Sequence, residues 1–406
     1  MSDAKFDNTT SHLVRNVVIS KLRECGSFTV PDIVEDTGIS PTTVAKYIYD
    51  MIREGIIEET GNVKAEHRGR RPLLYGLKSG HSFFMGVDVK SFGLSIGLMD
   101  ISGHLVKVES YEGFRYENTY ESLEELCAKV EGFMKGLDRK EAERIAAICF
   151  GLGGRVDSDT GTSSSIYNLE EFRDISLASF FEKRFNCRAF IENDTKAMTY
   201  GEYLSLRDKS IRNMLYVNIG WGLGLGMVVD GNLLRGHKGY AGEFGHIHSY
   251  DNDIICHCGK KGCIETEVSG NAIHRKLVNR IRNGENSVLS QKVLLSETIA
   301  LKDILLAAEK EDPLCVDLIS SMGSELGHHL AGMINIFNPE LIVIGGTFSS
   351  AISYYFLYPI RDAIRKYSLR LISKDLQVVS SVLGDNSGVL GTCMVARNRI
   401  FAERFA

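Results

Sequence analysis

The sequence lacks the features of an exported or membrane-spanning protein. Its first sixteen residues, MSDAKFDNTTSHLVRN, contain no apolar core of the kind that a signal peptide needs. No window approaches the roughly 20 apolar residues that a membrane helix requires. The nine cysteines are odd in number and mostly scattered, which argues against a disulfide framework. We therefore expect a cytoplasmic protein without a membrane partner.

The sequence also lacks an overall positive charge. It has 47 basic and 52 acidic residues, and its formal net charge is −5. Such a chain has no general attraction for nucleic acid, so any DNA contact must come from a local basic patch. Low-complexity segments and short-period repeats are absent as well. With 406 residues, the chain is long enough for two or three domains.

The N-terminal part of the chain has the pattern of a helix-turn-helix. Segments 12–26 and 29–38 resemble helices that each end at a glycine. Ser40 and Pro41 favour the start of a further helix over 41–55. In a helix-turn-helix, this last helix would lie in the major groove of DNA. The residues predicted to contact DNA from its polar face are Thr42, Thr43, Lys46 and Tyr47.

The segment that follows fits a wing, which is a two-stranded hairpin beside the helices. The sequence predicts strands at 56–60 and within 68–77, with a turn at Gly61–Asn62. The clearest compact basic run of the chain is formed by Arg68, Arg70 and Arg71. Arginines on an extended Gly/Pro backbone suit insertion into a narrow minor groove. A solvated charged loop is the alternative, but the position after a helix-turn-helix favours DNA contact.

The pattern of predicted secondary structure changes from residue 81 onward. Buried strands, such as those predicted at 146–154 and 338–346, alternate with helices. This alternation indicates an α/β architecture with mixed or parallel sheets. The strand pairs predicted at 83–100 and 214–234 resemble each other loosely, as the two halves of a duplicated fold would.

Seven motifs in this part of the chain occur in an order that is very specific to one family. They are GLGGRVD (151–157), IENDTKAM (191–198), GWGLGLG (220–226), GEFGH (242–246), CHCGKKGCIE (256–265), NPELIVIGG (338–346) and GVLG (388–391). From about residue 82 to the C-terminus, the chain resembles the ROK family, which comprises bacterial repressors and sugar kinases. The preceding helix-turn-helix and its RGRRP wing resemble the repressor branch of that family.

The resemblance implies the fold class. It is an α/β protein with an N-terminal winged helix-turn-helix, followed by a two-lobed actin/hexokinase-like ATPase fold. The expected domains are the DNA-binding domain at 1–80, an N-terminal lobe at 81–195 completed by a C-terminal helix at 386–406, and a C-terminal lobe at 196–385 that carries a metal site.

The cysteine cluster CHCGKKGC at 256–263 is a candidate metal site. The three thiolates are those of Cys256, Cys258 and Cys263. A tetrahedral zinc ion needs a fourth ligand, and His246, His248 and His257 are near enough in sequence. His257 is a poor candidate because adjacent ligands would strain the tetrahedron. The spacing matches neither a C-x-x-C redox pair nor a DNA-reading finger. The resemblance to the ROK family implies that His246 completes a structural zinc site.

The resemblance also implies a sugar site. Sugars carry many hydroxyl groups, which carboxylates and amides bind as directional hydrogen-bond partners. The residues at the positions that hold sugar in ROK kinases, with one further candidate in Arg155, are Arg155, Asn193, Asp194, Glu243, His246 and Glu265. The zinc ion would brace the loop that presents Glu243 and Glu265, and it would not act as a Lewis acid.

Two departures from the family pattern argue against ATP-dependent phosphotransfer. Asp194 matches the catalytic base of the kinases. However, the Asp-x-Gly-Gly-Thr phosphate loop of the kinases is replaced by Asp88-Val89-Lys90-Ser91-Phe92. The second phosphate loop, at 220–224, has Trp221 where kinases have a small hydroxyl residue. Its glycines are weak evidence for a nucleotide, because a tight hairpin also needs glycine.

These patterns together predict a sugar-responsive repressor of transcription and not an enzyme. Its expected partners are operator DNA and a sugar or sugar-phosphate effector, and paired operator half-sites favour a homodimer or homotetramer. The alternative is an ATP-dependent sugar kinase or a bifunctional kinase-regulator. Control by a protein partner that docks on the ROK domain is a third possibility.

Overall fold

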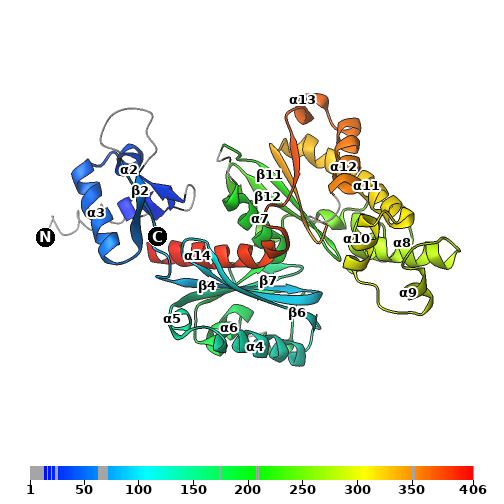
Figure 1. The fold of residues 1–406 in the computed structure, drawn as a ribbon, viewed down its shortest axis with the longest axis horizontal. Coiled ribbons are helices and arrows are strands. Elements are labelled where there is room, and N and C mark those ends of the chain that lie inside the picture. The colour runs from blue at the N-terminus through cyan, green and yellow to red at the C-terminus, as the bar shows by residue number, and fades with distance from the viewer. Residues whose placement is uncertain are drawn as a thin grey trace. The chain divides into compact units, whose positions relative to one another are not determined.

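The computed structural model shows two compact units, whose strands and helices appear in Figure 1. One unit comprises the chain up to Leu152, Thr160–Glu192 and the chain from Thr392 onward. The other comprises Gly153–Asp159 and Asn193–Gly391. The structure describes residues 13–15, 17–19, 21–22, 26–62, 72–172, 175–206, 208, 210–348 and 353–405.

The first helix of the predicted helix-turn-helix pair is α2 (Val30–Thr37). A capping box begins it, in which the Thr29 hydroxyl accepts a hydrogen bond from the Asp32 amide and the Asp32 carboxylate accepts one from the Thr29 amide. The helix ends at Gly38, whose φ of 66° lies in the left-handed region that glycine adopts without steric cost. Both helix boundaries are those that the sequence predicts.

The second helix of the pair is α3 (Pro41–Arg53), which begins after Ser40 as predicted. Its inner face packs Val44 and Ile48 into the core of the helix-turn-helix. The predicted position of Tyr47 on the exposed polar face of α3 is wrong, because the residue is only 4% exposed and is therefore not available to DNA in this structure. Residues three positions apart share one face of a helix, so Tyr47 follows Val44 into the core.

A three-stranded sheet in the order β1-β3-β2 completes the winged helix-turn-helix. Its strands are β1 (Ser27–Phe28), β2 (Ile57–Asn62) and β3 (Leu73–Leu77). The predicted turn at Gly61–Asn62 is wrong, because both residues belong to β2. A bulge between Glu59 and Gly61 lets that strand continue. The predicted DNA contacts of the wing, Arg68, Arg70 and Arg71, lie outside the described residues.

A five-stranded sheet in the order β10-β7-β4-β5-β6 forms the rest of the first unit. Its strands are β4 (Phe83–Lys90), β5 (Phe92–Asp100), β6 (Leu105–Arg115), β7 (Ile145–Leu152) and β10 (Ala189–Asn193). The central strand β4 pairs antiparallel with β5 and parallel with β7. The helices are α4 (Tyr120–Lys135), α5 (Arg139–Ala142), α6 (Leu177–Phe185) and the part of α14 (Ser387–Phe405) that follows Gly391.

The second unit contains a five-stranded sheet in the order β13-β12-β11-β14-β15. Its strands are β11 (Met214–Ile219), β12 (Leu223–Val229), β13 (Asn232–Leu233), β14 (Leu341–Gly346) and β15 (Gln377–Ser380). The central strand β11 pairs antiparallel with β12 and parallel with β14. The two sheets therefore share one strand order, as the loose likeness of the two predicted strand pairs suggested.

Helices of the second unit surround a continuous apolar core that includes Leu326, Leu330 and Ile334 of the longest helix. These helices are α8 (Gly270–Arg282), α9 (Ser290–Leu294), α10 (Leu301–Glu309), α11 (Pro313–Phe337), α12 (Ser353–Tyr367) and α13 (Arg370–Ser373). Helix α7 (Asp194–Ser205) instead packs in a separate apolar cluster, where its Met198 joins Met214 and Tyr216 of β11. Two further short strands are β8 (Val156–Asp157) in the second unit and β9 (Thr162–Ser163) in the first. Among the described residues, no helix has the length and apolar character to cross a bilayer.

Candidate functional site

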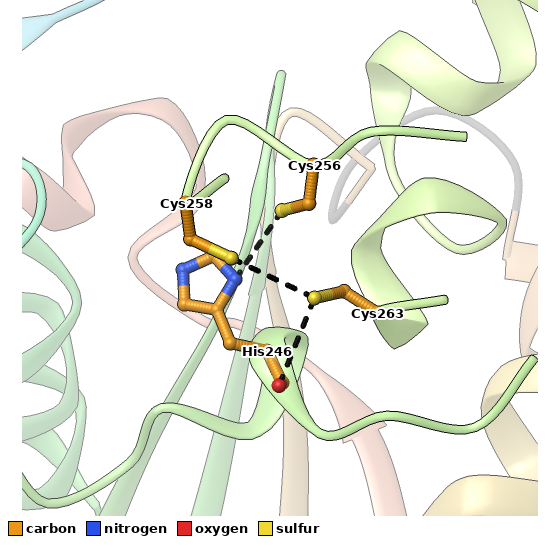
Figure 2. Close-up of side chains that lie close together, drawn as sticks. All are labelled: His246, Cys256, Cys258 and Cys263. Carbon is orange, nitrogen blue, oxygen red and sulfur yellow. Dashed lines mark hydrogen bonds between the residues drawn. The ribbon is translucent and has the colours of Figure 1, made fainter. Parts of the chain in front are cut away.

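Four side chains of the second unit point toward one another, as Figure 2 shows. They are His246, Cys256, Cys258 and Cys263. The ligand atoms that they offer all lie within 4.8 Å of one another. The residues predicted as a metal site are therefore brought together, although they come from separate loop segments.

The spacing of these four atoms fits tetrahedral zinc. The sulfurs of Cys258 and Cys263 are 3.7 Å apart, and His246 Nδ1 lies 3.5 Å from Cys256 Sγ. Zn–S bonds of about 2.3 Å and Zn–N bonds of about 2.05 Å at tetrahedral angles require separations of about 3.8 Å and about 3.6 Å. Three soft thiolates and one imidazole are also a donor set that zinc prefers.

Tight turns hold the cysteines in these positions. The Gly259 amide donates to the Cys256 carbonyl oxygen at 2.8 Å, which closes a turn around Cys258. Gly262 has a φ of 71°, and a Cβ there would overlap the Tyr250 carbonyl oxygen. Only glycine meets both conditions, so the glycines between the cysteines set the geometry of the cluster.

His257 and His248, the two alternatives to His246 as fourth ligand, do not complete the group of three cysteines. His257 Nδ1 is 2.7 Å from Glu265 Oε1, so this ring is engaged with a carboxylate. A second possible metal group, Cys256 with His257 and Glu265, overlaps the first. His248 belongs to neither group among the described residues. The geometry thus favours His246 as the partner of the three cysteines.

The carboxylate of Glu265 lies against the cysteine cluster. Glu265 Oε2 accepts a hydrogen bond from the Leu223 amide at 2.8 Å, and Oε1 faces His257. Burial disfavours the charged form, but the hydrogen bonds from His257 and Leu223 outweigh burial and lower the pKa of Glu265. The side chain therefore stays an anionic hydrogen-bond acceptor at neutral pH.

Glu243 lies on the other side of His246. Its Oε2 is 3.8 Å from His246 Nε2 and 3.9 Å from Arg155 Nε. These separations bring one carboxylate, one imidazole and one guanidinium together at the protein surface, since Glu243 and Arg155 are both exposed. Side chains of this kind can exchange hydrogen bonds with the hydroxyl groups of a sugar.

Asn193 and Asp194 mark the start of α7. The Asn193 side chain caps the helix by accepting from the Lys196 amide at 3.0 Å, and it donates to the Gly154 carbonyl oxygen at 2.9 Å. Asp194 Oδ1 accepts from the Thr195 amide at 2.6 Å. The positive end of the helix dipole stabilises an anionic side chain at this position.

All six residues predicted to bind sugar belong to the second unit. Asn193 donates a hydrogen bond to the carbonyl oxygen of Gly154. The next residue, Arg155, approaches Glu243. Cys256 Sγ lies 3.5 Å from His246 Nδ1 and 3.6 Å from Glu265 Oε1. A chain of contacts thus connects residues that are spread over more than one hundred positions of the sequence.

The glycine-rich hairpin at 220–226 has a packing role that the sequence does not reveal. A Cβ on Gly224 would overlap Thr195, and a Cβ on Gly226 would overlap Thr199. Both threonines lie on α7, one helical turn apart, and this helix packs directly on β12. The glycines therefore permit a close approach of helix and strand, and no nucleotide is needed to explain them.

The hairpin and the start of α8 also satisfy each other's backbone groups. The Gly270 amide donates to the Gly220 carbonyl oxygen at 2.9 Å, and the Asn271 amide donates to the Trp221 carbonyl oxygen at 3.0 Å. The Trp221 ring lies 5.6 Å from the ring of His274 on the same helix. These amide donors at the helix start are directed to the hairpin, where a phosphate would otherwise compete for them.

Comparison with known proteins places this architecture in a family. The family model described as "ROK family" matches residues 84–399, which is most of the chain. The chain belongs to the ROK family. The matched range covers the metal cluster and every residue predicted to bind sugar, whereas the winged helix-turn-helix precedes it.

Relatives of this ROK chain include both regulators and kinases. The DNA-binding transcriptional dual regulator NagC of Escherichia coli K12 is 29% identical over 366 residues, covering 90% of this chain and 87% of NagC. The crystal structure of a ROK family transcriptional regulator, a homolog of the E. coli MLC protein, has a TM-score of 0.79 and 28% identity, and covers 98% of both chains. The structure of a ROK glucokinase from Streptomyces griseus, in complex with glucose and AMPPNP, has a TM-score of 0.67 and 27% identity. It covers 78% of this chain and 100% of the kinase.

The packing role of the hairpin glycines is testable with one added methyl group. We expect Gly226→Ala to destabilise the second unit by about 1–3 kcal/mol, because the new methyl group overlaps Thr199. Thermal melting of the full chain measures the effect. Gly332→Ala is the matched control, since nothing lies within 4 Å of that position in α11. Equal melting temperatures of the two variants would contradict the packing role.

Proposed function

We propose that this chain is a transcriptional repressor that binds operator DNA and responds to a sugar or sugar phosphate. The observation that carries the proposal is the extent of the two structural likenesses. A ROK regulator matches 98% of this chain, whereas a complete ROK glucokinase matches 78% of it. The chain also has a winged helix-turn-helix ahead of the family domain, which is the part that reads DNA.

Residues of α3 and of the wing would contact the operator DNA. Thr42 and Lys46 are exposed on α3 and Thr43 is half-buried, so these side chains are available to the edges of bases and to phosphates. We assign a minor-groove role to the wing arginines, Arg68, Arg70 and Arg71. A homodimer or homotetramer in the cytoplasm would present two such helices to paired half-sites.

The effector would bind at the six residues of the second unit that the contacts connect. The carboxylates of Glu243 and Glu265 and the amide of Asn193 are suited to sugar hydroxyls. Zinc, held by His246 and the three cysteines, would neutralise the thiolates and brace the two glutamates. DNA binding and effector binding belong to different units, so the effector must favour one of two states of the chain to change DNA affinity.

A sugar kinase is the second candidate, because Asp194 is the first residue of α7, at the position that matches the family's catalytic base. Two observations favour the repressor. Residues 88–92 form a tight hairpin in which Lys90 pairs with Gly93, without the two glycines of a kinase phosphate loop. The amides of Gly270 and Asn271 are engaged by the second loop. Steady ATP turnover with any hexose, N-acetylhexosamine or pentose, lost in Asp194→Ala, would reverse the choice.

The DNA-binding role is tested by a gel shift on the promoter region upstream of the chain's own gene. We expect Lys46→Ala to weaken binding about tenfold, because it removes one positive charge from the recognition helix. A plot of the logarithm of the binding constant against the logarithm of the salt concentration should become less steep by about one unit, since one phosphate contact is lost. Lys140→Ala, which removes an exposed charge from α5, should bind as the unmodified protein does. Absence of specific binding by the unmodified protein at moderate salt would refute the repressor.

The metal site is tested by zinc content and stability. We expect the purified protein to hold one zinc ion per chain, and Cys258→Ser to lose it, because the remaining three ligands cannot close the tetrahedron. The variant should also lose its response to the effector while the winged helix-turn-helix stays folded. Cys187→Ser, at a half-buried cysteine outside the cluster, should keep its zinc. Full zinc content in Cys258→Ser would contradict the assignment.

The effector site is tested by thermal shift against a panel of sugars and sugar phosphates. We expect at least one ligand to raise the melting temperature and to release operator DNA in the gel shift. Glu243→Ala should abolish both effects, because its carboxylate is exposed beside His246 and Arg155. Glu297→Ala removes an exposed carboxylate elsewhere in the same unit and should respond normally. A response that survives Glu243→Ala would place the sugar elsewhere.

A further inference from the structure

A cleft of about 630 Å³ lies between α12, α13 and the start of β15 in the second unit. The two helices and the strand lie together at one end of this unit in Figure 1. None of the residues that line the cleft belongs to the metal cluster or to the proposed sugar site. The cleft is therefore a separate feature of the unit.

Four cationic side chains line this cleft. Arg361 and Arg365 are one turn apart on α12, and Arg370 and Lys374 are spaced in the same way at α13. The described lining contains no carboxylate. A formal charge of four positive units is thus gathered in one cleft of a chain whose net charge is −5. Concentrated charge of one sign raises the local concentration of oppositely charged ligands.

The four cations of the cleft make only one ion pair within the described part of the chain, that of Lys374 with Asp375. Arg361 is held in place because its Nε and Nη2 both donate to the Val378 carbonyl oxygen, at 3.2 and 2.5 Å. Within the described part of the chain, Arg365 and Arg370 have no carboxylate within ion-pair distance. Lys374 is 3.6 Å from Asp375, whose side chain is 85% exposed and so screens it weakly.

The remaining surface of the cleft is mostly apolar. Ile364 and Leu376 contribute hydrocarbon, and Gln377 and Ser373 add neutral polar groups. Guanidinium groups bind phosphate oxygens in pairs, through two parallel hydrogen bonds each. The apolar side chains in the lining suit the uncharged body of a phosphate ester.

We propose that this cleft binds a small phosphorylated metabolite that carries at least two negative charges. Such a ligand would bridge Arg361 and Arg365 of α12 to Arg370 and Lys374 at α13, and it would bind independently of the sugar. The chain would then respond to two chemical signals, one neutral or singly phosphorylated at the sugar site and one polyanionic at this cleft.

Pyrophosphate is the probe, and calorimetry with the full-length protein measures its binding. We expect Arg365→Gln/Arg370→Gln to weaken pyrophosphate binding about 100-fold, since each charge-assisted contact contributes about tenfold. The control is Lys302→Gln/Lys310→Gln, which removes two exposed charges from the start and the end of α10 in the same unit. This variant should bind pyrophosphate with unchanged affinity. All four substituted residues are exposed, and circular dichroism checks that the variants stay folded.

Three results would overturn the proposal. The first is the absence of pyrophosphate binding by the unmodified protein at millimolar concentration. The second is equal loss of affinity in the two double variants, which would indicate a general effect of charge. The third is loss of affinity for duplex DNA in Arg365→Gln/Arg370→Gln with pyrophosphate binding retained, which would make the cleft part of a DNA-binding surface. Glu243→Ala should bind pyrophosphate normally. This variant therefore separates a failure of the proposed sugar site from a failure of the proposed cleft.

Discussion

The close approach of three cysteine sulfurs and one imidazole is the constraint on which the functional part of the second unit depends. Segment 247–263 contains little regular secondary structure, so local hydrogen bonding alone holds it weakly. Sulfurs only 3.7 Å apart repel one another as thiolates unless a cation lies between them. A bound metal would therefore order the loop and, through His246, the carboxylate of Glu243 beside it.

A second constraint links the loop of the three cysteines to the rest of the unit. Glu265 joins the cysteine cluster to the amide of Leu223, which begins β12. The next residues of that strand are the glycines against which α7 packs, and α7 begins at Asp194. The position of the Asp194 carboxylate thus depends on the same strand that anchors Glu265. One strand and one helix set the geometry of residues that the sequence shows only as separate motifs.

The sequence predicted features that depend on neighbouring residues better than features that depend on packing. The helix boundaries at Thr29, Gly38 and Ser40 follow from capping chemistry that is readable within a few positions. Tyr47 was assigned to the polar face of α3 with Thr43 and Lys46, whereas in the structure it is buried on the face of Val44. Strand β2 continues through Gly61 because of a bulge, and no local sequence pattern predicts that bulge.

The candidate site was predictable as a set of motifs, because the family resemblance supplied their roles. Its internal contacts were not predictable. The approach of Arg155 to Glu243 and the contact of Glu265 with Leu223 join segments that are far apart in the chain. The threonines behind the hairpin glycines also went unnoticed, since spacing of one helical turn on α7 is common and gives no hint of its partner strand.

The packing of Thr195 and Thr199 against glycine limits which residues the hairpin of the second sheet can contain. In the first sheet, residues 88–92 of the corresponding hairpin contain no glycine. In the second sheet, replacement of Gly224 or Gly226 would force a helix away from its strand. The close packing of α7 on β12 therefore requires a glycine-rich hairpin whether or not a nucleotide binds there.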